Sequence, residues 1–575
     1  MFVTYDRRGA VITWDFERTE SHLQSWVVRK QTQARFTERG DRAEWGTFYL
    51  TAPIDPSITY QCSTSGPQRR NFATTGTLTN HFDTRWRDVL DDEPAFAFAK
   101  RFTLTGANST GSESALYTIA LAQDPIAQFA AARGLTEMKP LWKSYFATDR
   151  EMLDFHYSDY AAATSISKKF AHGVIADAQE MVSDTYADIV SLAARQVLGA
   201  TYFSGTPSNP ILWMKEISSN GNFQTVDVMF PSIPFFLYVN PTWLSYLMEP
   251  LLEHQGAGLY PNNYSMHDLG YHFPNATGHA DGRDEEMPVE ECGNMLIMAL
   301  AYAQSVDHKT AQKWIEPRYQ LWTQWTSFLV INSLVPDYQL STDDFAGRLQ
   351  NQTNLALKGL IGIRAMAGLA TIVGNAADAE LYTNISDSYL PLWHQYALSR
   401  DNTHLKLAYH WQGSWGTLYN LYAAPLLCFH ISGTYPTADI YTLQSSWYDN
   451  VHQSYGLPLD SRHLYTKSDW QLWAAAVSSP ETRDEIVQSM GRWVNETSTD
   501  RAMTDLYDTE GSGGFPGITF KARPVVGGLF SVLALKERCD GKAWSSMQKI
   551  FEGSGQGGGH MVGREGQIVL GRPST

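Results

Sequence analysis

"REMLDFHYSDYAAATSISKKFAHGVIADA" (residues 150–178) decides the fold, because from here on apolar residues recur with the spacing of an α-helix. The next run, "DTYADIVSLAARQVLGATYF" (184–203), has the same period and forms a long helical pair with it. Roughly a dozen such runs follow one another in consecutive pairs. An even series of helical hairpins is typical of an (α/α)6 toroid, in which loops at one end of the inner helices form a funnel-shaped site.

The chain before this stretch has the period of β-strands. Short alternating runs such as "GAVITWDF" (9–16), "WGTFYLTA" (45–52) and "ALYTIALAQ" (115–123) are separated by Gly, Asn and Pro. We therefore predict a multidomain α and β protein. A β-sandwich-like domain over residues 1–135 precedes an (α/α)6 six-hairpin toroid over 136–538. The first strand begins in mid-pattern, so we expect the sandwich to be truncated at its start.

The end of the chain, residues 539–575, is rich in glycine and has little apolar periodicity. We expect this tail to be disordered. The four cysteines are scattered and form no CxxC pair, which argues against a structural zinc site. Cys292 and Cys428 stand in apolar helical runs and are interpreted as buried thiols.

Composition excludes several classes of partner. The net charge of −16 argues against nucleic acid, which requires a basic surface. There is no P-loop or dinucleotide-binding pattern, and no run of 18 apolar residues that would span a membrane. We therefore expect a small-molecule substrate, no cofactor, no nucleic acid and no membrane. The oligomeric state stays open.

Polar motifs gather in the connections between the predicted helices. Each combines turn residues, a charged group and an aromatic residue, so a toroid would bring them to one end as a site for a polar substrate. The motifs are "WMKEISSNGNFQTVDVMFP" (213–231), "YPNNYSMHDLGYHFP" (260–274), "DGRDEEMPVEECGN" (281–294), "STDDFAGRLQNQTN" (341–354), "HWQGSWGTLYN" (410–420), "YGLPLDSRHLYTKSDW" (455–470) and "GGFPGITFKARPVVGG" (513–528).

In this order, these motifs resemble the fungal glutaminase A family over about residues 40–537. The resemblance implies a β-sandwich-like domain followed by a six-helical-hairpin domain, and hydrolysis of L-glutamine to L-glutamate and ammonia outside the cell. The chain starts without the family's secretion signal, and its N-terminus has no apolar stretch typical of a signal peptide. The hairpin fold and the "HDLG" loop also resemble (α/α)6 glycoside hydrolases.

Two carboxylates are our candidates for catalysis, Asp344 and Glu216. Asp344 is adjacent to Asp343 in a loop, where one of the pair can be buried with a raised pKa and act as an acid while the other binds substrate. Glu216 follows Lys215 and is a candidate nucleophile or base. The alternatives are a helix cap for the aspartates and an ion pair with Lys215 for Glu216.

The remaining candidates would bind the substrate. Asp227 stands on a strand-like apolar run, where an acid needs a fixed partner. An Arg or Lys together with a carboxylate is the minimum set for holding the α-carboxylate and α-ammonium of free glutamine. For His267, Asp268, Trp415 and Trp470, a structural role is about as well supported. The substrate-binding candidates are Asp227, His267, Asp268, Asp281, Asp343, Trp415, Arg462, Lys467 and Asp469.

The acidic run 281–291 places six carboxylates in eleven positions, just before an apolar helix. Glu290 and Glu291 fall in the first helical turn, where negative charge is stabilised by about 0.3–1 kcal/mol. Asp281 is the member expected to face the site, and Asp284 and Glu285 are expected to be exposed. The spacing does not fit an EF-hand, and we predict no metal site.

The sequence therefore predicts a glutaminase that uses loop carboxylates at the mouth of a helical toroid. Two alternatives stay open. One is a glycoside hydrolase with a Glu/Asp carboxyl pair, because nothing in the residues alone distinguishes an amide from a glycosidic bond. The other is a non-catalytic carbohydrate-binding protein, suggested by 18 Trp, 29 Tyr and 26 Phe.

Overall fold

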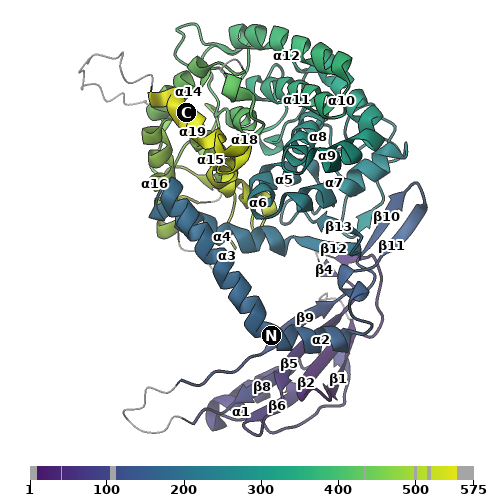
Figure 1. The fold of residues 1–575 in the computed structure, drawn as a ribbon. Helices are drawn as coiled ribbons and strands as arrows, with labels where there is room; N and C mark the ends of the chain where they lie inside the picture. Colours follow the sequence, from purple (N-terminus) through teal and green to yellow (C-terminus); the bar gives the residue numbers. More distant parts are fainter. Residues whose placement is uncertain are drawn as a thin grey trace, which may run out of the picture.

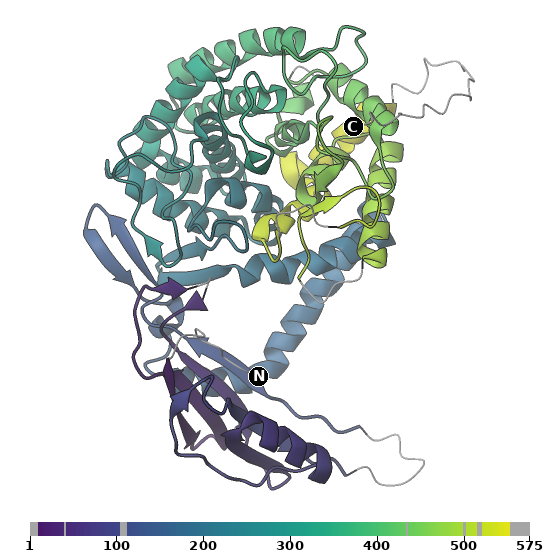
Figure 2. The same cartoon turned by 180° about the vertical axis from the view of Figure 1, so that it is seen from behind.

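The structure is a computed structural model that describes residues 10–39, 42–103, 112–432, 435–497, 502–514 and 520–552. A β-sheet domain comes first in the chain and a larger helical domain follows. The long helix α3 (Tyr160–Met181) runs from one to the other (Figure 1, Figure 2). The predicted order of a β domain followed by a helical domain is confirmed.

The centre of the first domain is a five-stranded sheet in the order β7-β1-β2-β5-β9. Trp14, Trp26 and Val28 project from one face and pack against aromatic side chains of a two-stranded sheet, β6–β8. The other face carries Val27 and Tyr49 and is covered by Leu153. The strands are β1 Val11–Arg18, β2 Leu23–Lys30, β5 Thr47–Pro53, β6 Ile58–Thr64, β7 Arg87–Asp88, β8 Pro94–Lys100 and β9 Thr118–Ala122, with helix α1 at Ser65–Thr75.

Residues 150–178 lie in two helices, α2 (Asp149–Ser158) and α3. Thr148 caps α2 by accepting from the Glu151 N–H, and the Glu151 side chain accepts from the Thr148 N–H in return. Leu153 lies in α2, so α2 belongs with the sheet domain. The predicted domain boundary between residues 135 and 136 falls inside β11 (Gly134–Met138), which pairs with β10 (Ala127–Ala131).

The helical domain consists of two rings. In the described part of the chain, six buried segments alternate in sequence with six helices that are buried on one side only. All residues of α8 are buried, whereas the longer α12 buries five. A helix surrounded by protein is apolar all round, while an outer helix is amphipathic. The predicted (α/α)6 arrangement is therefore present.

The inner segments and the outer helices have the following bounds. The inner segments are α5 Val226–Met229 with η2 Phe230–Ser232 and α6 Ile233–Val239, α8 Pro288–Ala303, α11 Thr353–Ile372, η5 Tyr419–Tyr422 with α13 Ala423–Leu426, α15 Ser468–Ala475, and η7 Pro524–Phe530 with α17 Ser531–Leu535. The outer helices are α4 Asp184–Gly199, α7 Pro241–Gly256, α9 His308–Ile315 with η3 Glu316–Arg318 and α10 Tyr319–Asn332, α12 Ala376–Ala397, α14 Ala438–Val451 and α16 Pro480–Glu496.

Short strands occur between the helices, which the sequence analysis did not predict. The predicted helix over 184–203 ends at Gly199, and residues 201–206 form β12, which pairs with β13. A short strand, β14, runs parallel to β10 and so joins that hairpin to the helical domain. These strands are β12 Thr201–Thr206, β13 Asn209–Met214, β14 Asn275–Ala276, β15 Tyr465–Lys467 and β16 Leu506–Asp508, with β3 Glu38–Arg39 and β4 Arg42–Ala43 near the start of the chain.

Inner helix α11 is long and apolar enough by composition to cross a membrane, with a mean hydropathy of 1.5. However, 78% of its most apolar 18-residue stretch is buried inside the protein. A helix that is buried among other helices belongs to the core, so α11 is a core helix.

The start of the predicted disordered tail is ordered, so the prediction is wrong for residues 539–552. Arg538–Gly541 forms α18 and Ala543–Glu552 forms α19, whose buried residues Met547 and Phe551 pack on the helical domain. The amphipathic run "AWSSMQKIFE" has the period of a helix, which the adjacent glycines obscured. Residues 553–575 lie outside the described residues.

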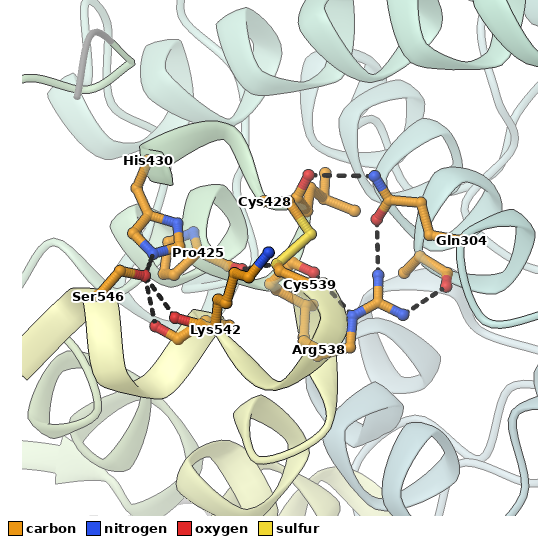
Figure 3. Close-up of a disulfide and its surroundings, with 12 residues drawn as sticks. Gln304, Pro425, Cys428, His430, Arg538, Cys539, Lys542 and Ser546 are labelled. Atoms are coloured by element: carbon orange, nitrogen blue, oxygen red, sulfur yellow. Dashed lines mark hydrogen bonds between the residues drawn. A yellow bond between two sulfur atoms is a disulfide. The ribbon is translucent and has the colours of Figure 1, made fainter. Parts of the chain in front are cut away.

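A disulfide between Cys428 and Cys539 fastens this C-terminal segment (Figure 3). The prediction that Cys428 is a buried thiol is therefore wrong, while Cys292 is a buried free thiol as predicted. Beside the disulfide, Arg538 donates to the carbonyls of Leu426 and Ala301 (2.9 and 3.1 Å). These bonds connect the end of the chain to α13 and α8.

Candidate active site

A polar cavity of about 360 Å³ lies at the N-terminal ends of four inner segments, α5, α8, α11 and η7. Five of the predicted polar connections meet there, and the connections 410–420 and 455–470 contribute no lining residue. The lining residues are Glu216, Ser218, Ser219, Asn220, Asp227, His267, Glu285, Asp344, Phe345, Phe520 and Arg523.

Glu216 follows strand β13 and forms part of the cavity wall. It is buried, and its carboxylate accepts hydrogen bonds from the Ser219 hydroxyl and from the Thr225 hydroxyl (3.1 Å). Arg523 lies 3.7 Å away. The prediction of Lys215 as its alternative partner does not match the structure, because Lys215 pairs with Glu38 instead.

Asp344 opens a short 3-10 helix, η4 (Asp344–Ala346), and also lines the cavity. Burial raises the pKa of its carboxyl group to about 6, and the negative charge of Asp227 adds to the effect. A carboxyl group that titrates near neutrality can give or take a proton at physiological pH. The structure thus brings both predicted catalytic carboxylates, Asp344 and Glu216, to one cavity.

Glu285 is a lining residue that the sequence analysis placed wrongly at the exposed surface. Burial raises the pKa of its carboxyl group to about 7. Asp284 was also expected to be exposed, but it is half-buried, and it accepts hydrogen bonds from the His267 N–H (2.7 Å) and the Tyr260 hydroxyl (2.8 Å). The loop before α8 folds inward because these donors satisfy Asp284.

His267 lines the cavity and is oriented from behind. Its Nδ1 lies 2.8 Å from Asp268, and the other oxygen of Asp268 lies 2.8 Å from His279 Nε2. Burial opposes a positive charge on His267, but its contacts with Asp227 and Asp268 outweigh this and raise its pKa well above the usual value. Asp268, a predicted substrate ligand, is therefore buried behind His267 and does not line the cavity.

Asp227 lies in the first turn of α5, not on the predicted strand. Its Oδ1 is 3.5 Å from His267 Nε2. Burial would raise its pKa, yet hydrogen bonding and the charge of His267 lower it overall. Asp227 thus has the fixed partner that the sequence analysis required of an acid in an apolar run.

Arg523 is the one arginine that lines the described cavity, and it was not predicted. Its guanidinium group lies 4.2 Å over the Phe520 ring and 3.5 Å from Asp505. The carboxylates around it raise its pKa although burial opposes the charge. Arg523 stands in the motif "FKARPVVGG", so the motif was recognised but this residue in it was not.

A second buried cluster lies beside the cavity and holds two predicted residues, Lys467 and Asp469. Lys467 Nζ is 3.2 Å from Asp469 and 3.5 Å from Asp505, which also contacts Arg523. Burial raises the pKa of Asp469 to about 6, which Lys467 opposes. Neither residue lines the cavity, so this cluster supports Arg523 from behind.

Asp343 is buried next to the cavity but does not line it. Its carboxylate accepts a hydrogen bond from the Tyr419 hydroxyl (2.9 Å), and burial raises its pKa to about 7. Trp470 stacks on Tyr419 with ring centroids 4.3 Å apart and is fully buried. Trp470 is therefore a core residue.

Three further predicted substrate ligands do not line the cavity, contrary to expectation. Arg462 donates hydrogen bonds to both carboxylate oxygens of Asp460 and to the Ala346 carbonyl (3.1 Å), so it fixes η4. Trp415 is half-buried and does not line the cavity. Asp281 is exposed and accepts from the Arg283 N–H in a turn. The spacing of these residues in the sequence does not show which way their side chains point.

Taken together, the cavity presents four carboxylates, one histidine and one arginine. Two of the carboxyl groups, Asp344 and Glu285, have pKa values raised toward neutrality by burial. A pair of carboxyl groups in different environments is the usual arrangement for separate acid and base roles. The arrangement suits hydrolysis of a small polar substrate.

Comparison with known proteins gives two family matches that together cover most of the chain. Residues 183–533 match the model of the glutaminase A six helical-hairpin domain, and residues 3–177 match a domain of unknown function. A probable glutaminase of Arthroderma benhamiae is 49% identical, over 95% of this chain and 73% of that protein. Glutaminase A of Aspergillus oryzae is 44% identical, over 92% of this chain and 75% of that protein.

Solved structures show a weaker likeness. A bacterial glucoamylase complexed with acarbose has a TM-score of 0.43 at 7% identity, over 94% of this chain and 84% of that chain. An α-1,6-mannanase variant of Salegentibacter has a TM-score of 0.34 at 12% identity, over 61% of this chain and 98% of that chain. At these values the likeness supports no further conclusion.

Proposed function

The chain belongs to the glutaminase A family, and from that premise we propose that its cavity hydrolyses the side-chain amide of L-glutamine. Water adds to the amide carbonyl carbon, the C–N bond breaks, and L-glutamate and ammonia leave. The observation that supports this cavity as the reaction site is its pair of carboxyl groups with pKa values near 6 and 7, Asp344 and Glu285.

Asp344 and Glu216 have separate roles in proton transfer. Glu216 is held by the hydroxyl groups of Ser219 and Thr225, which favour its role as the base that activates water. Asp344 has a raised pKa of about 6, which suits the acid that protonates departing ammonia. Each group supplies about 10²–10⁴-fold in rate when it acts as a general acid or base.

Arg523 holds the α-carboxylate of glutamine in this proposal. A guanidinium group binds a carboxylate with two parallel hydrogen bonds, and Arg523 is held on Phe520 by a cation–π contact. Glu285, another carboxylate that lines the cavity, favours the α-ammonium group. Each charged group of free glutamine is thus matched by a side chain of opposite charge.

The proposal is tested by incubating the purified protein with L-glutamine, with D-glutamine and with a panel of nitrophenyl glycosides. Ammonia, glutamate and nitrophenol are measured. We expect ammonia and glutamate in equal amounts from L-glutamine and much less from D-glutamine. Release of nitrophenol without ammonia would instead identify a glycoside hydrolase. Tight sugar binding without either product would identify a carbohydrate-binding protein.

We also propose that the protein works outside the cell on small molecules and binds neither nucleic acid nor membranes. The Cys428–Cys539 disulfide supports this location, because disulfides persist in oxidising compartments. The net charge of −16 supports the absence of a nucleic-acid partner. Activity in the culture medium of the producing organism, compared with activity in cell extract, tests the location.

A further inference from the structure

Three side chains from separate parts of the chain meet at the floor of the cavity: Asp227, His267 and Glu291. Asp227 lies in the first turn of α5, His267 in the loop after α7, and Glu291 in the first turn of α8. Each offers one ligand atom, and these atoms all lie within 4.8 Å of one another. All three side chains are buried.

Two of the oxygens at this point lack a close hydrogen bond. Asp227 Oδ1 has only the long 3.5 Å contact with His267 Nε2, and Glu291 Oε1 has no hydrogen-bond partner. The residues that carry them are 7% and 0% exposed. The other oxygen of Glu291 accepts from the Asn294 side chain (2.9 Å), so this carboxyl group is fixed with one oxygen left over. A buried polar atom without a partner costs free energy unless a ligand occupies the gap.

His267 is held in the orientation of a metal ligand. Its Nδ1 is 2.8 Å from Asp268, which in turn is fixed by His279 and by the Gly270 N–H (2.7 Å). The ring therefore directs Nε2 toward Asp227 at 3.5 Å and toward Glu285 at 3.8 Å. A carboxylate behind a histidine that fixes its tautomer is the common outer arrangement of metal sites.

We propose that Asp227, His267 and Glu291 bind one divalent transition-metal ion, with Zn²⁺ and Mn²⁺ as the candidates. One nitrogen and two carboxylate oxygens are donors that these ions accept. His267 would release its Nε2 proton when the ion binds, so that two carboxylates and a neutral imidazole balance the charge of a dication. Lys358 already pairs with the neighbouring Glu290 (2.8 Å), so it does not neutralise Glu291 by direct contact.

The position of the ion follows from which ligands face the cavity. Asp227 and His267 line it, whereas Glu291 does not. The ion would therefore lie in the floor with free coordination positions on the cavity side, as catalytic metal sites keep them. Ligands of a tetrahedral ion lie about 3.3 Å apart, so binding would bring the two most distant ligand atoms closer by up to about 1.5 Å.

This inference concerns binding and does not rest on the proposed glutaminase activity. The absence of a local motif explains why the sequence analysis predicted no metal. His267 follows Asp227 by 40 positions and Glu291 follows His267 by 24, and the three residues come from two helices and a loop. Only the fold brings them together.

The direct test is metal analysis of the purified full chain, followed by calorimetric titration of chelator-treated protein with ZnCl₂ and with MnCl₂. We expect one saturable site per chain for at least one ion. Glu291→Gln should weaken binding at least tenfold, and Asp268→Asn, which loosens His267, about 10–100-fold. The matched control is Glu286→Gln, an exposed carboxylate in the same loop, which should bind as the wild type does.

Two results would overturn the proposal. One is the absence of saturable binding of either ion to the wild-type protein. The other is unchanged affinity in a folded Glu291→Gln variant. If that variant does not fold, the visible absorption of the wild-type protein with CoCl₂ tests the metal site instead. A histidine-ligated ion gives d–d bands that Zn²⁺ displaces, and a spectrum equal to free Co²⁺ contradicts the site.

Discussion

At the scale of single residues, burial decides what each carboxylate does. The acidic run 281–291 shows this, because its members end in four different surroundings. Asp281 is exposed, Asp284 is satisfied by His267 and Tyr260, Glu285 lines the cavity, and Glu290 pairs with buried Lys358. All of them belong to one short acidic run in the sequence, so only the fold separates these roles.

Asp343 allows the cost of a buried acid to be measured. Its pKa is about 7 in the folded chain, against 3.8 for an ordinary aspartate. A raised pKa means that the folded state loses stability as pH rises from about 4 to about 7. Asp343→Asn cannot ionise, so it should stabilise the protein at pH 8 by up to about 4 kcal/mol and have little effect at pH 4.

Thermal unfolding of both proteins between pH 4 and pH 8 checks this prediction. The gain in midpoint temperature should grow up to about pH 7 and then level off. Asp281→Asn, an exposed aspartate, is the control and should show no such trend. A loss of stability in Asp343→Asn that is equal at every pH would show that Asp343 is needed as a charged partner.

The candidate site was predicted in part at this scale. Glu216, Asp227, His267 and Asp344 line the cavity, since acids and histidines in turn-rich connections tend to face a polar interior space. Arg462 and Lys467 do not, because each is already neutralised by a neighbouring aspartate. A charge pair between residues two positions apart satisfies the cation locally, and the sequence alone does not show whether it forms.

At the scale of elements, glycines control how closely inner helices approach. A Cβ at Gly362 in α11 would lie 2.8 Å from Leu329 of α10 and 3.1 Å from the Cα of Gly293 in α8. Three inner and outer helices therefore meet at this point without room for a methyl group. The sequence shows the helical period but not this contact.

Gly362→Ala should destabilise the protein by about 1–3 kcal/mol, because the added methyl group forces the helices apart. Gly173→Ala in α3 is the matched control. A Cβ there meets nothing within 4 Å, so alanine should stabilise the protein by up to about 1 kcal/mol through its helix propensity. Chemical unfolding of both variants measures the difference, and equal effects would contradict the close packing of α8, α10 and α11.

The elements themselves were largely predictable. Helices α2, α3 and α7 follow the apolar period of the sequence, and α8 follows its long apolar run. Strands β12 and β14 were missed because they are short, and β14 also pairs with β10, which is far away in the sequence. Helix α19 was missed because the tail 539–575 was judged by its high glycine content as a whole, although its first residues have the period of a helix.

At the scale of the whole molecule, the Cys428–Cys539 disulfide closes the helical domain. It joins residues 111 positions apart and so restricts the unfolded chain strongly. Four scattered cysteines permit several pairings, so the sequence could not assign this one. The ring of helices brings the two cysteines together only when the last inner segment is in place.

Replacing both cysteines, Cys428→Ser with Cys539→Ser, should cost about 2–5 kcal/mol of stability. A reducing agent should lower the unfolding temperature of the wild-type protein and leave that of the double variant unchanged. The free thiols Cys62 and Cys292 remain in both proteins and serve as the internal control. Equal sensitivity of the two proteins to the reducing agent would contradict a stabilising disulfide.

The central claim is that the carboxylates of this cavity hydrolyse glutamine, and one measurement tests it most directly. Ammonia release from L-glutamine is followed for the wild type, Asp344→Asn and the control Asp281→Asn. We predict that kcat falls about 10²–10⁴-fold in Asp344→Asn and is unchanged in Asp281→Asn. In the wild type, kcat should decline as pH rises through about 6, where Asp344 loses its proton. Near wild-type ammonia release by a folded Asp344→Asn variant would contradict this account.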